Sequence, residues 1–337
     1  MSFIQHYSIS IHFAQALINA TNKAGLDKHQ LLHEAGINEG LLNNPHFRIT
    51  PEQYSTLMQI AWRESDDDFL GMGTQRCRHG IFSLMAKEAV RCKDLESVYH
   101  HLCRFYNLVN ESIRLTLNIE GDDVALSMSL SDPKLDPDLL LREFLMLLWH
   151  RFPSWLVGQR IPLKEVRFTH KPPAHIAEYQ LMFPCPTRFE QSTNTFVFSK
   201  EWLNLPVVQT RQTLKHHLRR APLDWFTRQA FFPVYTRRVL DYLEQTDDLA
   251  TSMEAIAQAL HLSERTLRRK LISEGSNFQK IKDIVRRDKA IHYLSQPSIP
   301  IAQVSSLLGF SEPTAFTRAF KQWTGESPTS YRLAAKQ

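Results

Sequence analysis

The sequence lacks a long hydrophobic run. Its most apolar stretch, Leu139 to Trp149, is interrupted by Arg142 and Glu143, whereas a membrane helix needs about 18 apolar residues in succession. The N-terminus has no basic region followed by an apolar block, which is the mark of a secretory signal. We therefore expect a cytoplasmic protein that has no membrane partner.

Cysteine is scarce, with 4 in 337 residues and no Cys-x-x-Cys motif. A chain of this length does not depend on a disulfide framework. The pairs His100-His101 and His216-His217 have no second cluster that would complete tetrahedral zinc. The sequence predicts reduced thiols, no metal site and no cofactor.

Motifs of catalysis are also missing. Gly71-Met72-Gly73 has no third glycine for a nucleotide-binding turn, and no Gly-x-Ser-x-Gly nucleophile motif occurs. The run Asp66-Asp67-Asp68 lacks the glycine and distal glutamate of a calcium loop, so we interpret it as a solvated turn. We expect a protein that is not an enzyme and has no catalytic residues.

What the sequence does have is an uneven charge. Residues 225–337 carry 16 Lys and Arg against 11 Asp and Glu, an excess of five, and residues 1–224 carry 24 of each. The whole formal net charge of +5 therefore belongs to the last third of the chain. A neutral large part joined to a basic small part predicts two domains, of which the second meets a polyanion.

The larger part shows both helical and strand periodicity. Alternation over 112–118 and 124–130, on either side of Glu120-Gly121-Asp122-Asp123, predicts a β-hairpin. Short strands are expected at 166–169 and 195–198. Helices are expected at 13–24, 28–35, 54–63 (after Thr50-Pro51), 95–109 and 137–156. This pattern predicts an α+β N-terminal domain, and the mixed, basic segment 207–233 should contain its boundary.

From residue 235 onward the sequence reads as helical and contains an internal repeat. Residues 256–263 match residues 304–311 at an offset of 48. Each copy has a short helix, a tight turn, and Ser263 or Ser311 positioned to cap a second helix that opens on a glutamate. Leu267 and Leu271 in one copy, and Phe316 and Phe320 in the other, are the expected buried anchors. The pattern predicts two helix-turn-helix motifs, whose second helices enter the DNA major groove.

The outward residues of the two second helices suit DNA. Arginine reads guanine by a bidentate pair, either cation binds phosphate, and threonine can contact phosphate or a thymine methyl. The candidate DNA-binding residues are Arg265, Thr266, Arg268, Arg269, Lys270, Ser311, Thr314, Thr317, Arg318 and Lys321. A connecting helix over 277–294, about 27 Å long at about 1.5 Å per residue, would let one chain reach two successive major grooves.

Residues 235–333 resemble the DNA-binding domain of the AraC/XylS family of bacterial transcription regulators. The resemblance is carried by Gly309-Phe310-Ser311, by Phe316-x-Arg318-x-Phe320-Lys321, and by Gly325-x-Ser327-Pro328-x-x-Tyr331-Arg332. It implies that Arg265, Arg268, Arg269, Thr314, Thr317 and Arg318 match the family's DNA-contacting positions. Leu271 departs from the phenylalanine of many members.

The N-terminal part resembles the arabinose-binding-like sensor domain of ornithine-utilisation regulators in the same family. The matching features are residues 31–37, Arg48-Ile49-Thr50-Pro51, 69–73 and 183–189. The resemblance implies an effector-binding and dimerising domain over 1–210, a basic linker over 211–233 and a DNA-binding domain over 234–337. Within the last, the motifs would cover about 253–274 and 301–323.

An effector site is less clearly marked. The apolar helix 137–156 contains Arg142, Glu143 and His150, which could anchor a carboxylate-bearing or partly apolar ligand. We therefore expect a ligand-responsive homodimeric activator that binds promoter DNA and works with RNA polymerase. Two alternatives stay open: a DNA-associated alkyl-acceptor enzyme that uses Cys185, and a constitutive DNA-binding protein whose N-terminal domain only dimerises.

Overall fold

The computed structural model describes residues 8–227, 234–246, 249–274, 276–296 and 298–336. Their contacts define two compact units, each of which is made of segments that are not continuous in the sequence. Unit 1 comprises Met1–Ala14, Leu32–Thr56 and Phe226–Gln337, and unit 2 comprises Gln15–Leu31 and Leu57–Trp225. In the described part of the chain, no helix combines the length and the hydrophobicity of a membrane-spanning segment.

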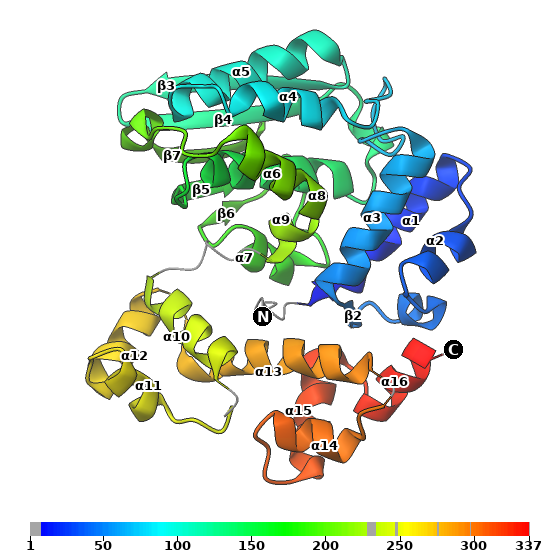
Figure 1. Ribbon diagram of the computed structural model, residues 1–337, viewed down its shortest axis with the longest axis vertical. Helices are drawn as coiled ribbons and strands as arrows, with labels where there is room; N and C mark the ends of the chain where they lie inside the picture. The colour runs from blue at the N-terminus through cyan, green and yellow to red at the C-terminus, as the bar shows by residue number, and fades with distance from the viewer. Residues whose placement is uncertain (1–7, 228–233, 247–248, 275, 297, 337) are drawn as a thin grey trace. The chain divides into compact units, whose positions relative to one another are not determined.

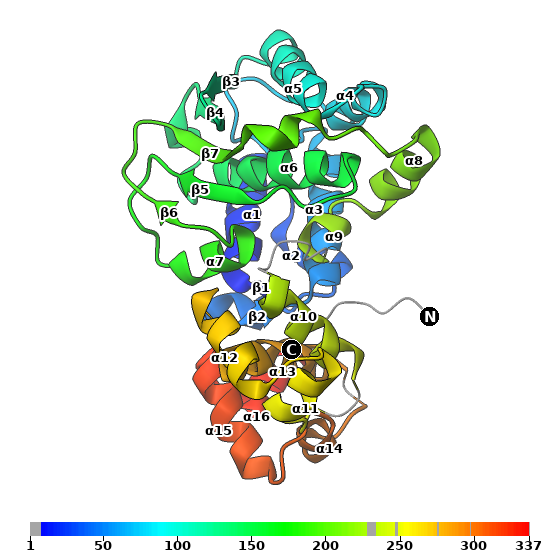
Figure 2. The same ribbon diagram turned by 90° about the vertical axis from the view of Figure 1, so that its left-hand side faces the viewer.

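Unit 2 contains a five-stranded sheet, in which the strands follow one another in the order β3-β4-β7-β5-β6 (Figure 2). Their bounds are β3 Ile113–Glu120, β4 Asp123–Leu130, β5 Leu163–Arg167, β6 Thr187–Arg188 and β7 Asn194–Ser199. β3 and β4 form the predicted antiparallel hairpin. Gly121 in its turn has a φ of +59°, which glycine adopts without steric cost.

The core of unit 2 lies where this sheet meets its helices. β7 is the middle strand, and Phe196 and Phe198 on it are completely buried. Both rings lie near Tyr99 of α5, with centroid distances of 6.3 Å and 5.4 Å. The helices of this unit are α4 Ile81–Ala89, α5 Leu95–Val109, α6 Leu140–Leu156, α7 Tyr179–Met182, α8 Arg211–Arg220 and the start of α9 Leu223–Thr227.

Two helix starts in unit 2 follow from local hydrogen bonds. Asp94 and Ser97 form a capping box, so α5 begins at the predicted Leu95. α6 begins at Leu140, three residues later than the sequence predicted. The reason is Asp136, whose buried carboxylate accepts the backbone N–H groups of Leu141 and Arg142 and so holds the preceding segment outside the helix.

The segment that the sequence predicted as a basic linker is folded up to residue 227. Thr210 and Thr213 form a capping box at the start of α8. Leu214, His217 and Trp225 are buried, and the Trp225 indole N–H donates to His217 Nε2 at 3.1 Å. Residues 228–233 of the expected linker lie outside the described residues. The domain limits at 210 and 234 stay a prediction.

Four of the described helices, α9 among them, carry residues of both units. α1 spans Ile11–Lys23 and α3 spans Pro51–Ser65, and α2, Lys28–Glu34, lies between them in the sequence. The start of α3 is as predicted, because the Thr50 hydroxyl accepts the Gln53 N–H and the Gln53 side chain accepts the Thr50 N–H in return.

Among its described residues, the regular structure of unit 1 is helical apart from one short strand pair, β1 Ile9–Ser10 with β2 Arg48–Ile49. Figure 1 shows the long helix α13 running between the group α10–α12 and the group α14–α16. The bounds are α10 Val234–Gln245, α11 Met253–Ala259, α12 Glu264–Ser273, α13 Phe278–Leu294, α14 Ile301–Leu307, α15 Pro313–Thr324 and α16 Pro328–Lys336. This confirms the predicted architecture: an α+β part followed by helical repeats joined by a central helix.

Candidate nucleic-acid interface and ligand cavity

The first helix-turn-helix motif is built from α11 and α12. Ser263 caps α12 by accepting the Thr266 backbone N–H, as predicted. Leu267 and Leu271 are buried and fix one face of α12 to the rest of the unit. The turn between the helices contains His261 in the left-handed conformation, with a φ of +57°. The opposite face of α12 is left to solvent.

Three arginines occupy that solvent face. Arg265, Arg268 and Arg269 are exposed, and together with Thr266 and Ile272 they surround a hollow of about 380 Å³. Arg268 donates to Glu264 one turn earlier at 2.6 Å, an exposed pair that phosphate can displace because such pairs contribute only about 0.3–0.5 kcal/mol. Lys270 differs, because its ammonium lies 5.3 Å from the centroid of the Tyr235 ring.

The second motif, α14 and α15, starts its second helix differently from the prediction. Ser311 does not cap α15, and Glu312 is not its first residue; Glu312 is the N-cap position and makes no side-chain cap bond. Pro313 opens the helix instead. Proline suits this position because it lacks the N–H that would otherwise need a partner.

The buried and exposed faces of α15 agree with the sequence. Phe316 and Phe320 are completely buried, as predicted. Ser311, Thr314, Arg318 and Lys321 are exposed, and the half-buried Thr317 donates its hydroxyl to the Pro313 carbonyl at 2.9 Å. α15 therefore offers fewer cations than α12.

Arg286 on α13 links the segment that precedes α11 to the turn of the second motif, a role that the sequence did not reveal. Its guanidinium donates to the carbonyls of Leu249, at 3.0 Å, and Gly309, at 2.9 Å. It also lies over the Phe310 ring, 4.4 Å from the centroid. The carbonyl groups that accept these bonds belong to the backbone, so no residue type in the sequence marks them. The available signal was an arginine on the inner side of the connecting helix.

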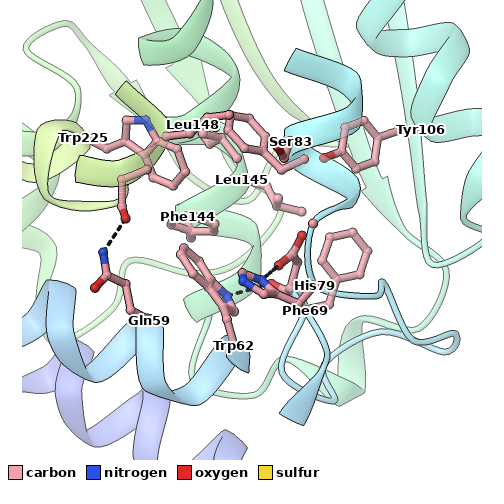
Figure 3. A pocket seen from close by; sticks show the side chains of 15 residues that line it. Gln59, Trp62, Phe69, His79, Ser83, Tyr106, Phe144, Leu145, Leu148 and Trp225 are labelled. Carbon is pink, nitrogen blue, oxygen red and sulfur yellow. Dashed lines mark hydrogen bonds and ion pairs between the residues drawn. The ribbon is translucent and has the colours of Figure 1, made fainter. Parts of the chain in front are cut away.

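Unit 2 contains a cavity of about 450 Å³. The helices α3, α4, α5, α6, α8 and α9 and the loop before α4 provide its walls (Figure 3). Most of the wall is aromatic or aliphatic, and the polar side chains are few. The lining residues are Gln59, Trp62, Asp68, Phe69, His79, Gly80, Phe82, Ser83, Tyr106, Phe144, Leu145, Leu148, Leu218, Ala221 and Trp225.

Asp68 and His79 form a hydrogen-bonded pair in this wall, with 2.8 Å between Asp68 Oδ1 and His79 Nδ1. Burial raises the pKa of Asp68, and the hydrogen bond with Asp68 raises the pKa of His79. A cavity of this size with a few polar groups has the character of a small-molecule site.

Comparison with known proteins identifies the chain's relatives. Residues 25–207 match the family described as the arabinose-binding domain of AraC transcription regulators, N-terminal, and residues 256–334 match a helix-turn-helix domain. The chain belongs to the AraC family of transcription regulators. It is a DNA-binding transcription regulator with an arabinose-binding-type N-terminal domain, which confirms the resemblances seen in the sequence.

Relatives of this AraC-family chain match it over different lengths. The ornithine utilization regulator of Pseudomonas aeruginosa is 26% identical over 332 residues, which cover 97% of this chain and 96% of that protein. The regulator VirS of Mycobacterium tuberculosis is 41% identical over 81 residues, 24% of each chain. The crystal structure of CdpR from Pseudomonas aeruginosa is 20% identical and covers 96% of this chain and 98% of its own, with a TM-score of 0.33.

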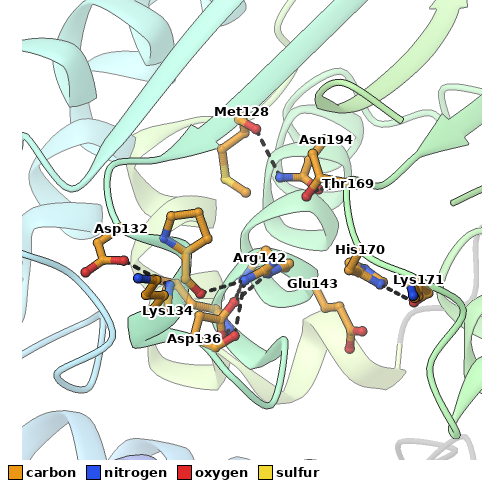
Figure 4. Close-up of polar contacts among 12 residues, drawn as sticks. Met128, Asp132, Lys134, Asp136, Arg142, Glu143, Thr169, His170, Lys171 and Asn194 are labelled. Atoms are coloured by element: carbon orange, nitrogen blue, oxygen red, sulfur yellow. Dashed lines mark hydrogen bonds and ion pairs between the residues drawn. The ribbon is translucent and has the colours of Figure 1, made fainter. Parts of the chain in front are cut away.

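The three predicted ligand residues lie on α6 but do not line the cavity of this AraC-family chain. Figure 4 shows Arg142 turned to Asp136, to which its Nε donates at 2.9 Å. Glu143 accepts hydrogen bonds from the His175 ring, at 2.9 Å, and from the Tyr179 hydroxyl. The same helix supplies Phe144, Leu145 and Leu148 to the cavity wall instead.

The loop 66–79 holds cavity residues that the sequence did not point to. The interpretation of Asp66-Asp67-Asp68 as a solvated turn was wrong for Asp67, whose buried carboxylate accepts the backbone N–H groups of Phe69, Gly71 and Cys77. That bonding orders the loop and places Asp68 at the cavity. The sequence did contain one indication that this loop is partly buried, namely the apolar residues that directly follow the aspartates.

Proposed function

We propose that this chain is a transcriptional activator controlled by a small molecule, and that α12 and α15 read its operator. The observation that carries the proposal is the row of exposed arginines on α12, a helix whose other face is firmly buried. The proposed contact residues are Arg265, Thr266, Arg268, Arg269, Lys270, Ser311, Thr314, Thr317, Arg318 and Lys321.

Different roles follow from their exposure. Arg265, Arg268 and Arg269 on α12 and Arg318 on α15 can reach base edges, and a bidentate arginine–guanine pair contributes about 1–3 kcal/mol of discrimination. Lys270 and Lys321 suit phosphates, which supply most of the affinity and make it dependent on salt. α12 would therefore carry more of the sequence preference than α15.

Binding to DNA fragments from the upstream region of the chain's own gene tests this assignment. Arg268→Ala and Arg318→Ala should each weaken specific binding by roughly 5- to 150-fold, corresponding to about 1–3 kcal/mol, and Lys321→Ala should reduce the salt slope by about one. Arg91→Ala removes an exposed arginine from the turn that follows α4 and is the matched control. Specific binding that persists in Arg268→Ala and Arg318→Ala would contradict the assignment.

The regulatory part of the proposal assigns the effector to the cavity of unit 2. Functionally, we assign dimerisation to residues 1–210 and DNA binding to 234–337, in the cytoplasm. Effector binding is assigned to residues 1–210 together with Leu218, Ala221 and Trp225 of the expected linker 211–233, which line the cavity. In vitro transcription with RNA polymerase, with and without effector, should show activation, and sedimentation should show a homodimer. A chain that acts equally with and without any cavity ligand would be the constitutive alternative.

The alkyl-acceptor alternative has less support. Burial raises the pKa of the Cys185 thiol to about 12, so the reactive thiolate is disfavoured at neutral pH. In the described residues no group of three or more metal-ligating side chains accompanies it. Labelling of Cys185 by alkylated DNA would nevertheless establish that function.

A further inference from the structure

The cavity of unit 2 carries information about the chemical class of its ligand. Its volume of about 450 Å³ lies within the range of about 300–1,000 Å³ that is typical of small-molecule sites. Among the described lining residues there is one carboxylate, Asp68, and neither lysine nor arginine. A carboxylate ligand would find neither an ammonium nor a guanidinium group there and would approach an acidic side chain.

The carboxylate of Asp68 is incompletely bonded. Its Oδ1 pairs with His79 and the backbone N–H of Phe82 acts on the carboxylate, while Oδ2 is buried and makes no close hydrogen bond with the residues that the structure describes. An unmet buried acceptor costs about 1–3 kcal/mol, and more when it is charged. A ligand that donates a hydrogen bond from a positively charged group would remove that cost.

Aromatic rings lie close to this carboxylate. The Trp62 ring stacks on His79 with 6.3 Å between centroids, and its indole N–H donates to the Asp68 carbonyl at 3.2 Å. The centroid of the Phe144 ring lies 5.8 Å from the ring centroids of both Trp62 and Trp225 (Figure 3). Tryptophan faces attract cations, by about 2 kcal/mol when water is excluded.

We propose that the cavity binds an organic ammonium ion with a compact apolar body. The ammonium group pairs with Asp68 beside the Trp62 ring, and the apolar body lies against Phe144, Leu148 and Trp225. This inference rests on the proposed function, because it names the class of effector. It replaces the carboxylate-bearing ligand that the sequence suggested.

Matched compounds that differ only in charge test the proposal. Calorimetry on the full-length chain would compare phenethylamine with phenethyl alcohol and phenylacetate, and tryptamine with tryptophol and indoleacetate. At least one amine should bind about tenfold or more tightly than its alcohol, and neither acid should bind better than its alcohol. Acids that bind best, or no binding by any of the six compounds, would overturn the proposal.

Two variants locate the charge effect. Asp68→Asn should abolish the preference for amine over alcohol while the alcohol still binds, which also shows that the cavity is folded. Asp66→Asn, in the same loop but outside the cavity wall, should keep the preference. An amine preference that survives in Asp68→Asn would overturn the assignment. Specific DNA binding is measured separately, so intact DNA binding without amine binding refutes the ligand class alone.

Discussion

His150 on α6 is completely buried, and its Nε2–H donates to the Ile161 carbonyl at 2.8 Å. Burial lowers the pKa of His150 to about 3, and the nearby charges of Arg151 and Arg160 act in the same direction. An unfolded histidine takes a proton near pH 6.5. The folded chain therefore holds this ring neutral over a pH range in which the unfolded chain binds a proton.

The stability of unit 2 should consequently depend on pH through His150. Because the folded pKa is depressed, its contribution is complete above pH 6.5 and is lost as the pH falls from there towards 3. Between pH 7 and pH 5 the wild type should lose about 2 kcal/mol more than His150→Gln, which keeps a donor but does not titrate. Urea unfolding at both pH values measures the difference.

A control separates His150 from the other titrating groups. His33→Gln alters an exposed histidine of α2 and should reproduce the wild-type loss between the two pH values. Equal losses in His150→Gln and wild type would show that the buried ring does not control this pH dependence.

At the scale of elements, the two helix-turn-helix motifs repeat a left-handed turn residue. His261, between α11 and α12, has a φ of +57°, and Gly309, between α14 and α15, has a φ of +70°. Their surroundings differ. A Cβ on Gly309 would lie 2.6 Å from the Ala250 nitrogen and 2.7 Å from the Leu249 carbonyl carbon, whereas His261 is exposed.

The same residue introduced at the two positions should therefore have unequal effects. Gly309→Ala forces backbone to move and adds about 1–2 kcal/mol of left-handed strain, so it should destabilise unit 1 by about 2 kcal/mol or more. His261→Ala should cost less than about 1 kcal/mol, because histidine already carries that strain. Hydrogen exchange of α14 and α15 along a urea series measures the loss of stability in each variant. Equal losses of stability in the two variants would refute the close approach at Gly309.

Local signals explain which elements the sequence could predict. The alternation in β3 and β4 and the caps at Thr50 and Ser263 act within a few residues, and those elements lie where they were expected. The first residue of α6 depends on hydrogen bonds to the carboxylate of Asp136, and the first residue of α15 is set by the ring of Pro313. At both places a local interaction overrode the helical periodicity of the sequence. α4 was not predicted, because its N-cap residue is Gly80, which has no side chain to mark the start of a helix.

At the scale of the molecule, the features that the sequence did not predict are those formed by contacts between residues far apart in the sequence. Apart from Ser311, which precedes α15, the candidate DNA contacts lie along one helix each, so their pattern was visible in the sequence. The cavity gathers Trp62, Asp68, Phe144 and Trp225 from four separate segments, and no periodicity links them. Unit 1 likewise joins residues 32–56 to a segment that begins at Phe226.

That joining has a defined contact at its centre. Phe47 is 4% exposed, and its ring lies 5.2 Å from the ring of Tyr331 on α16, edge to face. The Tyr331 hydroxyl donates to the carbonyl of Arg48, and the Arg48 guanidinium donates to Ser8, whose hydroxyl in turn donates to Asp288 of α13. Tyr331, part of the pattern shared with the AraC family, therefore binds the N-terminal segment into unit 1.

Phe47→Ala should therefore loosen helices of the DNA-binding part although residue 47 lies far from them in sequence. Truncating a buried phenylalanine costs about 3–5 kcal/mol, and here the cost should appear as faster hydrogen exchange in α15 and α16, with β4 and β7 unchanged. Phe183→Ala removes a completely buried ring of unit 2 and should give the reverse pattern. Unchanged hydrogen exchange in α16 of the Phe47→Ala chain would show that the N-terminal segment does not stabilise unit 1. The expected pattern would instead make residues 8–14 and 32–56 a structural part of the DNA-binding unit.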